Sequence, residues 1–174
     1  DPERLRRGRA SRERPTLQEA ARRVRYDALR AMAERHLAER LATAHNLDDQ
    51  AETVLLNLMR GSGTSGLAGI APARRLAGGW LVRPLLDVPR SDLEAYARRH
   101  SLQPIADPSN LEQQFDRNYL RHEILPRLEA RWPDAAGRIR RSAALAREAT
   151  TLLLDLAEID RRIERSAAIL QQVS

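Results

Sequence analysis

The sequence has no cysteine, few aromatic residues and no long apolar run. Because none of its 174 residues is cysteine, disulfide bonds and thiolate metal sites are excluded, and a cytoplasmic protein is the default expectation. Aromatic residues make up only 3% of the chain, too few for a surface that stacks many unpaired bases. Apolar runs stay well short of the roughly 20 residues that cross a bilayer. We therefore expect a soluble, globular protein.

Lysine is absent as well, so all 30 basic residues are arginine. The net charge is +6 and the isoelectric point is near 10.9. This balance favours a polyanionic partner, because the guanidinium group pairs with phosphate through a planar fork. Arginines are dense in residues 1–14, which we interpret as a flexible, basic lead-in.

The stretch 41–69 combines a short apolar run, a helix with an acidic start and a glycine-rich loop. Residues 40–44 are predicted to form a strand, and the loop 61–69 holds four glycines. This order is typical of the ligand-binding edge of an α/β sheet. Four polar residues at the helix start share about a third of its circumference, namely His45, Asp48, Asp49 and Glu52. The apolar side of this helix, which we expect a sheet to bury, carries Ala51, Val54, Leu55 and Leu58.

Further elements are predicted on both sides of this stretch. A helix covers 15–37, a second strand covers 80–85, and a helix over 91–100 opens with the capping-box spacing of Ser91 and Glu94. The buried stripe of the first helix is expected at Ala20, Val24, Ala28, Ala31 and Leu37.

The last third of the chain is predicted to be helical. After a turn at 107–110, helical spacing runs over 115–132 with an interruption at Pro126. A long helix follows from Asp134. Its apolar positions are Ile139, Ala143, Leu145, Leu152, Leu156, Ile159 and Ile163.

The acidic cluster allows two interpretations. Acids in the first turn of a helix offset the macrodipole, and Asp49 with Glu52 has capping-box spacing, so local stability explains part of the cluster. Three carboxylates on one face also repel one another unless a cation lies among them. A magnesium ion bridging phosphates or a substrate ammonium group would supply that charge. A zinc site is not expected, because there is no HExxH motif, and the glycine loop lacks the lysine of a P-loop.

Several motifs then follow one another along the chain. The central stretch reads His45-x-x-Asp48-Asp49-x-x-Glu52-Thr53, then Arg60-Gly61-Ser62-Gly63 and Gly66-Leu67. Further on come Arg83-Pro84-Leu85-Leu86, Asp107-Pro108-Ser109-Asn110 and Arg117-Asn118-x-x-Arg121. This series resembles the tRNA(Ile)-lysidine synthase family, which belongs to the PP-loop ATP pyrophosphatases. The likeness extends from about Leu17 to Trp132.

The resemblance implies a fold and a division into domains. It implies an α/β fold with a partial Rossmann-like parallel sheet of the adenine nucleotide alpha hydrolase type, followed by an α-helical segment. Residues 15–112 would be the C-terminal part of the PP-loop nucleotide-binding domain, and residues 113–174 a helical, tRNA-facing region.

The resemblance also implies a reaction in two steps. ATP would adenylate the carbonyl oxygen of the wobble cytidine of tRNA(Ile), with release of pyrophosphate. The amine of free L-lysine would then attack the same carbon and expel AMP, which leaves lysidine. The expected cofactors are ATP and Mg²⁺, the expected partners are tRNA(Ile) and lysine, and no membrane is involved.

Individual roles come from the same family pattern. Lysine binding would fall to Asp49 and Glu52 with His45 and Arg25 nearby. Catalysis would involve Asp48 and Asp49, with Asp48 close to the ATP phosphates or their magnesium ion, and Arg117, which would stabilise developing charge. Nucleotide or tRNA binding is expected at Arg60, Gly61, Ser62, Gly63, Asn118 and Arg121.

One part of the family pattern is missing. The phosphate-binding SGGxDS loop does not occur in this sequence, and the C-terminal tRNA-binding module is also expected to be absent. We therefore expect that this chain alone neither adenylates tRNA nor releases pyrophosphate from ATP. Two alternatives stay open, a related PP-loop tRNA thiolase and a non-catalytic basic RNA-binding fragment. A homodimer is compatible with the sequence.

Overall fold

The computed structural model describes residues 17–76, 78–103 and 116–173. The chain divides into two compact units. The first comprises the residues up to Leu41 together with Arg74–Val82, and the second comprises Ala42–Ala73 and Arg83–Ser174. The domain boundaries expected from the sequence, near residues 14 and 112, lie outside the described residues and stay predictions.

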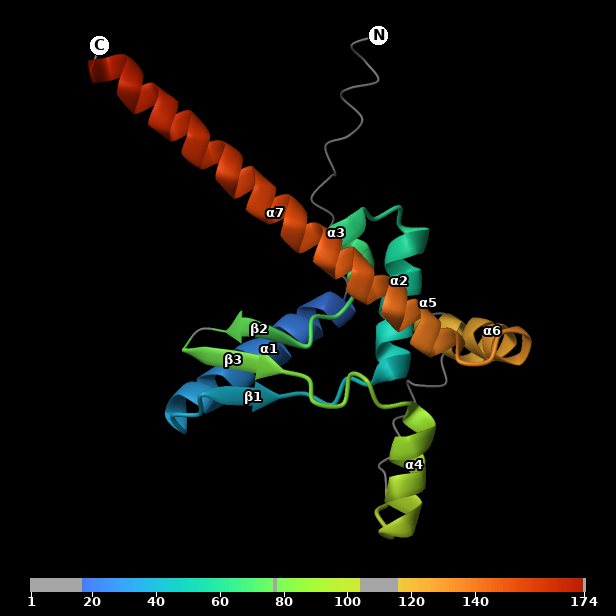
Figure 1. The fold of residues 1–174 in the computed structure, drawn as a ribbon. Helices are drawn as coiled ribbons and strands as arrows, with labels where there is room; N and C mark the ends of the chain where they lie inside the picture. The colour runs from blue at the N-terminus through green and yellow to red at the C-terminus, as the bar shows by residue number, and fades with distance from the viewer. Residues whose placement is uncertain (1–16, 77, 104–115, 174) are drawn as a thin grey trace. The chain divides into compact units, whose positions relative to one another are not determined.

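The first unit holds helix α1 (Leu17–Arg35) and a three-stranded sheet of β1 (Arg40–Ala42), β2 (Ala73–Leu76) and β3 (Gly79–Val82). The strand order is β1-β3-β2. In Figure 1 the arrows of β1 and β3 point the same way and that of β2 points the opposite way, so the sheet is mixed. The predicted strands correspond to β1 and β3. The sequence did not predict β2, because its ARRL residues are mostly exposed and lack apolar alternation.

A glycine lets β3 approach the chain just before β1. The amide of Trp80 donates to the carbonyl of Glu39 over 2.9 Å. A Cβ atom at Gly79 would collide with that same carbonyl oxygen. The pairing of β3 with β1 therefore requires glycine at this position.

The predicted buried stripe of helix α1 is confirmed only in part. Ala20 is half-buried, whereas Val24 and Leu37 are 68% and 90% exposed. Tyr26, Leu29 and Ala33, which lie outside the predicted stripe, are also half-buried, and the guanidinium carbon of Arg74 lies 5.5 Å from the Tyr26 ring centroid. The helix ends at Arg35 because Leu37 takes a left-handed conformation with φ 50°. Thr16, the predicted N-cap, lies outside the described residues.

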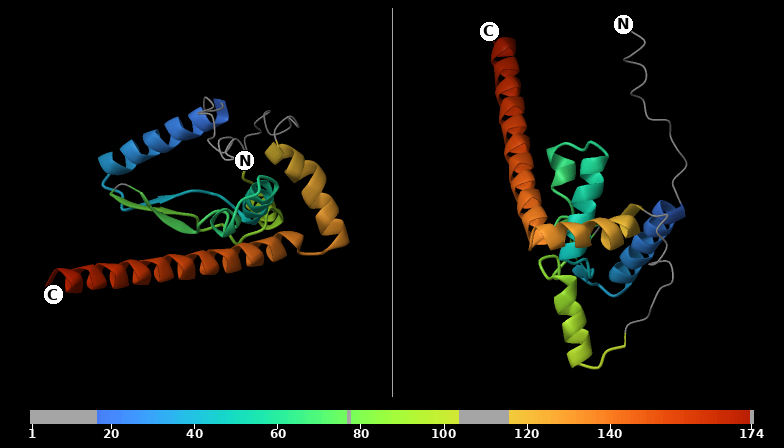
Figure 2. Two further views of the ribbon diagram at one scale, coloured as in Figure 1. Left: turned by 90° about the horizontal axis from the view of Figure 1, so that it is seen from above. Right: turned by 90° about the vertical axis from the view of Figure 1, so that its right-hand side faces the viewer.

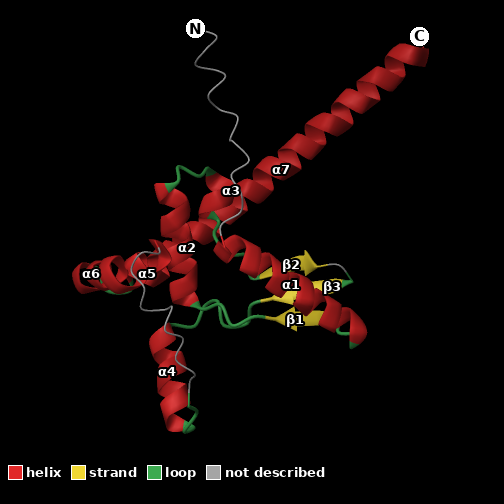
Figure 3. Cartoon of the chain, turned by 180° about the vertical axis from the view of Figure 1, so that it is seen from behind, coloured by secondary structure: helices red, strands yellow, loops and turns green. Residues whose placement is uncertain are grey.

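The second unit is built from helices, shown in red in Figure 3. They are α2 (Leu47–Met59), α3 (Thr64–Leu67), α4 (Arg90–Arg99), α5 (Asp116–Tyr119), the π-helical turn η3 (Leu120–Ile124), α6 (Leu125–Arg131) and α7 (Ala135–Val173). Helix α2 lies at the centre and contacts α7, α3, α5 and η3. The predicted turn at 107–110 falls outside the described residues.

Helices of the same unit pack against α2. Ala51 and Val54 are buried as predicted, whereas Leu58 is 50% exposed. Helices α7 and α3 contact α2, and burial of its apolar side against a sheet stays a prediction. Apolar spacing identified the buried face but carried no information about which element would cover it.

The helical pattern over 115–132 becomes three short elements in the structure. The turn η3 has the wider i to i+5 hydrogen bonding of a π-helix and ends two residues before Pro126. Since proline has no amide hydrogen to donate to the preceding turn, a local departure from α geometry is expected there. Leu120 and Leu125 are buried on the two sides of this turn.

Helix α7 contains 39 residues and begins one residue after the predicted start. Its first part is packed, with Ala135 and Ala143 at 6% and 1% exposure. Beyond α2 and α3 the helix continues past the other helices of its unit (Figures 1 and 2). The predicted apolar positions there are more than half exposed, namely Leu145, Leu152, Leu156, Ile159 and Ile163.

Candidate functional site

The start of α2 is closed by a capping box that differs from the predicted one. Asn46 is the N-cap, and its Oδ1 accepts the amide of Asp49 at 3.0 Å. In return, Asp49 Oδ2 accepts the amide of Asn46, also at 3.0 Å. The prediction that paired Asp49 with Glu52 is therefore wrong, and Glu52 is free for another role.

Glu52 is fully buried between two arginines that come from a distant part of the chain. Its exposure is 0%. Arg117 Nε donates to Glu52 Oε2 at 2.6 Å, and Arg121 Nε donates to Glu52 Oε1 at 2.6 Å. Arg121 Nη2 also reaches Oε2 at 3.0 Å. The four-residue spacing of these arginines across α5 and η3 places both guanidinium groups on one side, facing α2.

The same arginines also reach neighbouring groups on α2. Arg117 Nη2 donates to the carbonyl of Asp49 at 3.2 Å and to Thr53 Oγ1 at 3.3 Å. Arg121 Nη2 lies 3.4 Å from Asp49 Oδ1. Burial lowers the pKa of the Arg121 guanidinium, but its hydrogen bond to Glu52 and the charges of Glu52, Asp49 and Asp48 raise it above its ordinary value. The cation that the acidic cluster requires is therefore supplied, at least in part, by the protein itself.

Asp48 and His45 lie near this cluster in the sequence, but each has a hydrogen bond to a residue outside it. The Oδ2 atom of Asp48 accepts the amide of Arg90 at 2.8 Å, which satisfies an orphan donor at the start of α4. His45 Nδ1 shares a hydrogen bond of 3.0 Å with Thr43 Oγ1. The predicted capping box of Ser91 and Glu94 is not formed, since α4 starts without a side-chain cap of its own. Arg25 is exposed on α1, in the first unit.

The described side chains do not assemble a magnesium site. No group of three or more histidine, aspartate or glutamate residues within the described ranges could hold a metal ion. Asp48 has one carboxylate oxygen bound to an amide, and Asp49 and Glu52 face guanidinium groups. A magnesium ion in a nucleotide site is usually held by one or two carboxylates together with substrate phosphates and water, so a role for Asp48 beside such an ion stays a prediction.

The glycine loop is fixed by polar side chains from α2 and α7. Gln50, only 1% exposed, accepts the amide of Ile70 at 2.6 Å. Asn57 Nδ2 donates to the carbonyl of Gly66 at 2.7 Å. Arg147 Nη2 donates to the carbonyls of Ala68 and Ile70, both at 2.9 Å. These anchoring side chains could not be predicted from the sequence, because a buried glutamine or arginine leaves no periodic signal.

One glycine of this loop is required by its surroundings. Gly69 has a φ of +62°, and a Cβ atom there would lie 2.7 Å from Gln50 Oε1 and 2.9 Å from Val54 Cγ2. Glycine is therefore required here by the positive φ and by the close packing of the two side chains. Arg60 is the C-cap of α2 and is exposed, whereas Asn118 is buried, with 8% of its surface exposed. Binding of nucleotide or tRNA by Arg60, Gly61, Ser62, Gly63, Asn118 or Arg121 stays a prediction.

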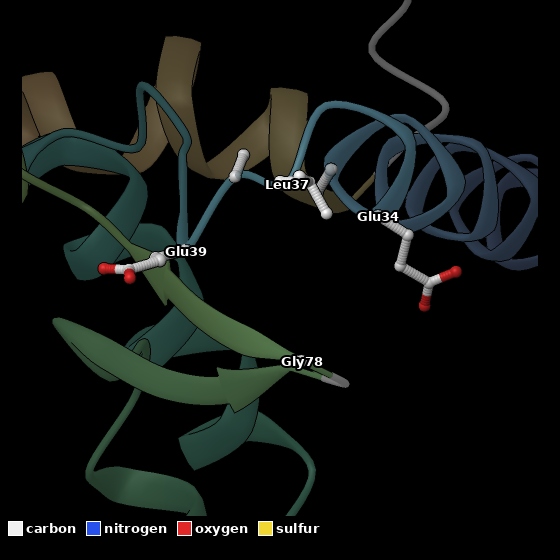
Figure 4. A pocket seen from close by; sticks show the side chains of 6 residues that line it. Glu34, Leu37, Glu39 and Gly78 are labelled. Carbon is white, nitrogen blue, oxygen red and sulfur yellow. The ribbon is translucent and has the colours of Figure 1, made fainter.

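The first unit contains a separate shallow pocket of about 310 Å³ (Figure 4). It is lined by residues at the end of α1, the following turn and the β2–β3 hairpin. The carboxylates of Glu34 and Glu39 point away from one another in Figure 4. Without convergent polar groups, this pocket is a weaker candidate than the Glu52 cluster.

Comparison with known proteins identifies the family. The PP-loop domain matches residues 4–128 of the chain. The chain belongs to the PP-loop family. The α/β fold class expected from the sequence is confirmed. Within the described ranges, no helix has both the length and the apolar character to span a membrane.

Several curated PP-loop relatives are named tRNA(Ile)-lysidine synthase. The protein of Pseudomonas fluorescens is 52% identical over 145 residues, which is 83% of this chain and 32% of the relative. Those of Pseudomonas aeruginosa and Coxiella burnetii are 51% and 47% identical, over 84% and 83% of this chain and 33% and 32% of the relatives. The chain thus spans about a third of the length of these relatives. The predicted resemblance is confirmed.

A solved structure shares the fold. It is the U34-tRNA thiolase NcsA from Methanococcus maripaludis with its [4Fe-4S] cluster. The match has a TM-score of 0.56 with 22% identity, and it covers 69% of this chain and 40% of that chain. At this identity, the match shows the fold alone.

Proposed function

We propose that this PP-loop chain carries the lysine-handling part of a tRNA(Ile)-lysidine synthase. The observation that carries the proposal is the Glu52 cluster, which consists of Asp49, Glu52, Arg117 and Arg121. Its arginines belong to one family motif and its acids to another. The identity of about half over most of the chain supports the same function. The proposed reaction is ATP-dependent ligation of lysine to the wobble cytidine of tRNA(Ile), in the cytoplasm.

Asp49 is the carboxylate best placed to receive the lysine ammonium group. Its side chain is 21% exposed, whereas that of Glu52 is 0% exposed. The cap hydrogen bond orients Asp49 Oδ2 toward Asn46, and Oδ1 lies at the edge of the arginine pair, 3.4 Å from Arg121 Nη2. A charge-assisted hydrogen bond to this oxygen would hold the substrate amine in place.

Glu52 then acts through the arginines and does not touch the substrate. By holding Nε of both Arg117 and Arg121, it fixes the direction of both guanidinium groups. The Arg117 side chain remains 34% exposed, so it can face the negative charge that develops as AMP leaves the activated base. A fixed guanidinium stabilises such charge without reorganisation during the reaction.

The chemistry requires only that the amine be neutral when it attacks. Lysine nitrogen forms a bond to the cytidine carbon, the bond from that carbon to the adenylated oxygen breaks, and AMP departs with that oxygen and the bonding electrons. The nitrogen loses its protons to surrounding base or water. A magnesium ion on the ATP phosphates, with Asp48 near it, would assist the preceding adenylation.

The proposal is tested in a chimeric enzyme. The whole chain replaces the matching third of the Pseudomonas aeruginosa synthase, and incorporation of labelled lysine into tRNA(Ile) is measured beside tRNA-dependent release of pyrophosphate. We expect Asp49→Asn to raise the KM for lysine about ten- to a hundredfold with pyrophosphate release retained. Asp92→Asn, an exposed acid in the first turn of α4, is the matched control.

Two results would contradict the proposal. A folded chimera that releases pyrophosphate but never incorporates lysine would remove the lysidine assignment. Equal loss of both steps in Asp49→Asn would remove the role of Asp49. RNA binding with steep salt dependence and no response to lysine would favour a non-catalytic RNA-binding module instead. A thiolase is disfavoured because the chain has no cysteine.

A further inference from the structure

The part of α7 that follows Arg147 is an amphipathic surface without a partner among the described residues of its unit. The packed first third of the helix ends near Arg147, which reaches the carbonyls of Ala68 and Ile70. Beyond it, leucine and isoleucine side chains are 53% to 65% exposed. Isolated apolar side chains on a surface need no explanation, but a continuous row of them does.

The row follows a heptad repeat. Taking Leu145 as position d, the alternating steps of four and three residues give Ala149, Leu156 and Ile163 at position a and Leu152 and Ile159 at position d. Leu153 and Leu154 do not belong to the row, since the residues seven positions later are Asp160 and Arg161. A sustained row of apolar a and d residues is the pattern of a two-stranded coiled coil.

We propose that the part of this seam from Leu152 to Ile163 pairs with the same residues of a second copy of the chain in antiparallel orientation. In an antiparallel pair, an a residue of one helix lies beside a d residue of the other. With Leu156 beside Ile159 of the second copy, Leu152 lies beside Ile163 of the second copy. The two-fold axis repeats both contacts, so every layer between 152 and 163 is apolar. The proposal does not depend on the lysidine reaction.

The charges beside the seam select the antiparallel orientation. Asp155 and Arg162 both occupy position g, directly before the a residues Leu156 and Ile163. In an antiparallel pair g faces g, so Asp155 lies opposite Arg162 of the second copy, and the symmetry gives this attractive pair twice. In a parallel pair g faces e, and Asp155 would lie opposite Asp160. Opposite charges favour the first arrangement, and like charges disfavour the second.

Arg162 can join this contact at little cost. Within its own chain it pairs with Glu158 at 3.3 Å, and its side chain is 76% exposed. An exposed pair of this kind contributes little to stability. Exchanging it for Asp155 of a second copy therefore does not oppose association.

The first test is the mass of the chain in solution over a wide range of concentrations, measured by sedimentation equilibrium. We expect the mass to rise from 19.7 kDa toward twice that value as the concentration rises. Leu156→Glu should shift the dissociation constant upward by at least tenfold. Leu154→Glu is the matched control, because Leu154 is 65% exposed on the same helix but outside the seam, and it should leave the mass curve unchanged. A chain that is monomeric throughout overturns the proposal, and so does equal weakening by both variants.

The second test separates the two orientations. The chain has no cysteine of its own, so introduced cysteines report without background. A mixture of Leu152→Cys and Ile163→Cys chains should form a mixed disulfide. Leu152→Cys alone should not, because the two copies of residue 152 would lie about 16 Å apart along the axis. Rapid crosslinking of Leu152→Cys with itself, without the mixed product, overturns the antiparallel arrangement.

The third test uses the flanking charges. Asp155→Arg should weaken association, since it places two arginines opposite one another. Arg162→Asp should weaken it as well, and the double variant should restore it. In a parallel pair, Asp155→Arg would face Asp160 and strengthen association. The sign of this single change therefore supports or overturns the orientation, and circular dichroism confirms that each variant keeps its helix.

Discussion

Two glutamates of this protein each pair with two arginines, and their surroundings differ in every other respect. Glu52 on α2 is 0% exposed, and its partners Arg117 and Arg121 lie 65 and 69 residues later in the chain. Glu158 on α7 is 44% exposed, and its partners Arg161 and Arg162 lie on the next turn of its own helix. The first pairing joins three elements of the fold, whereas the second only lies along the surface of one helix.

The difference shows where a charge cluster carries information. A surface carboxylate keeps its water, so its ion pairs add little and can be exchanged. A buried carboxylate has lost its water and depends on its partners. Glu52 with both arginines is therefore a constraint on the geometry of the site.

The largest expected effect comes from removing one charge in each region. Glu52→Gln leaves two guanidinium groups without their buried anion and should lower the free energy of unfolding by about 3–5 kcal/mol. Glu158→Gln, the same change at the surface, should stay within about 0.5 kcal/mol. Urea unfolding followed by circular dichroism measures both. If the two variants lose equal stability, the contrast between the regions is wrong.

The next effect concerns apolar side chains of the same two helices. Val54 on α2 is 7% exposed and packs beneath the glycine loop, so Val54→Ala should cost about 1–3 kcal/mol. Leu154 on α7 is 65% exposed, and Leu154→Ala should change stability by less than about 0.5 kcal/mol. Thermal unfolding of the two variants side by side gives the comparison. A large loss for Leu154→Ala would show that this part of α7 is covered.

The smallest effect separates an acid that caps a helix from one that does not. Asp48 accepts the amide of Arg90 at the start of α4, so Asp48→Ala should cost about 1 kcal/mol and speed hydrogen exchange in α4. Asp160→Ala, at an exposed position inside α7, should leave exchange unchanged. Mass spectrometry of exchanged peptides resolves the two helices. Unaltered exchange in α4 after Asp48→Ala would remove its capping role.

The sequence predicted the parts of this fold that depend on local patterns. The start of α7 near Asp134, the strand beginning at Arg40 and the buried Ala51 and Val54 follow from helical spacing and apolar runs. Strand β2 was missed, since its burial pattern is set by its neighbours and its residues are polar. The buried face of α1 was predicted only in part, since Ala20 is half-buried but Val24 is exposed, and helical spacing alone does not show which positions a neighbour covers.

The same limit applies to the candidate site. The motif placed Asp49 and Glu52 together on α2, and the separate motif with Arg117 and Arg121 was named for other roles. Nothing in local spacing joins residues 65 positions apart, so their meeting in one cluster required the structure. The buried anchors Gln50 and Arg147 were missed for the same reason, because each contacts a backbone group far away in sequence.

The reach of these contacts has a consequence for synthesis of the chain. Arg147 binds carbonyls 79 and 77 residues before it, so the glycine loop cannot close until α7 has left the ribosome. Glu52 must likewise wait for Arg121, and its carboxylate stays hydrated in the meantime. Such distant contacts form late and slow the search for the native state. The cluster of acids therefore takes shape only after the segment that carries Arg121 has been made, long after the acids themselves.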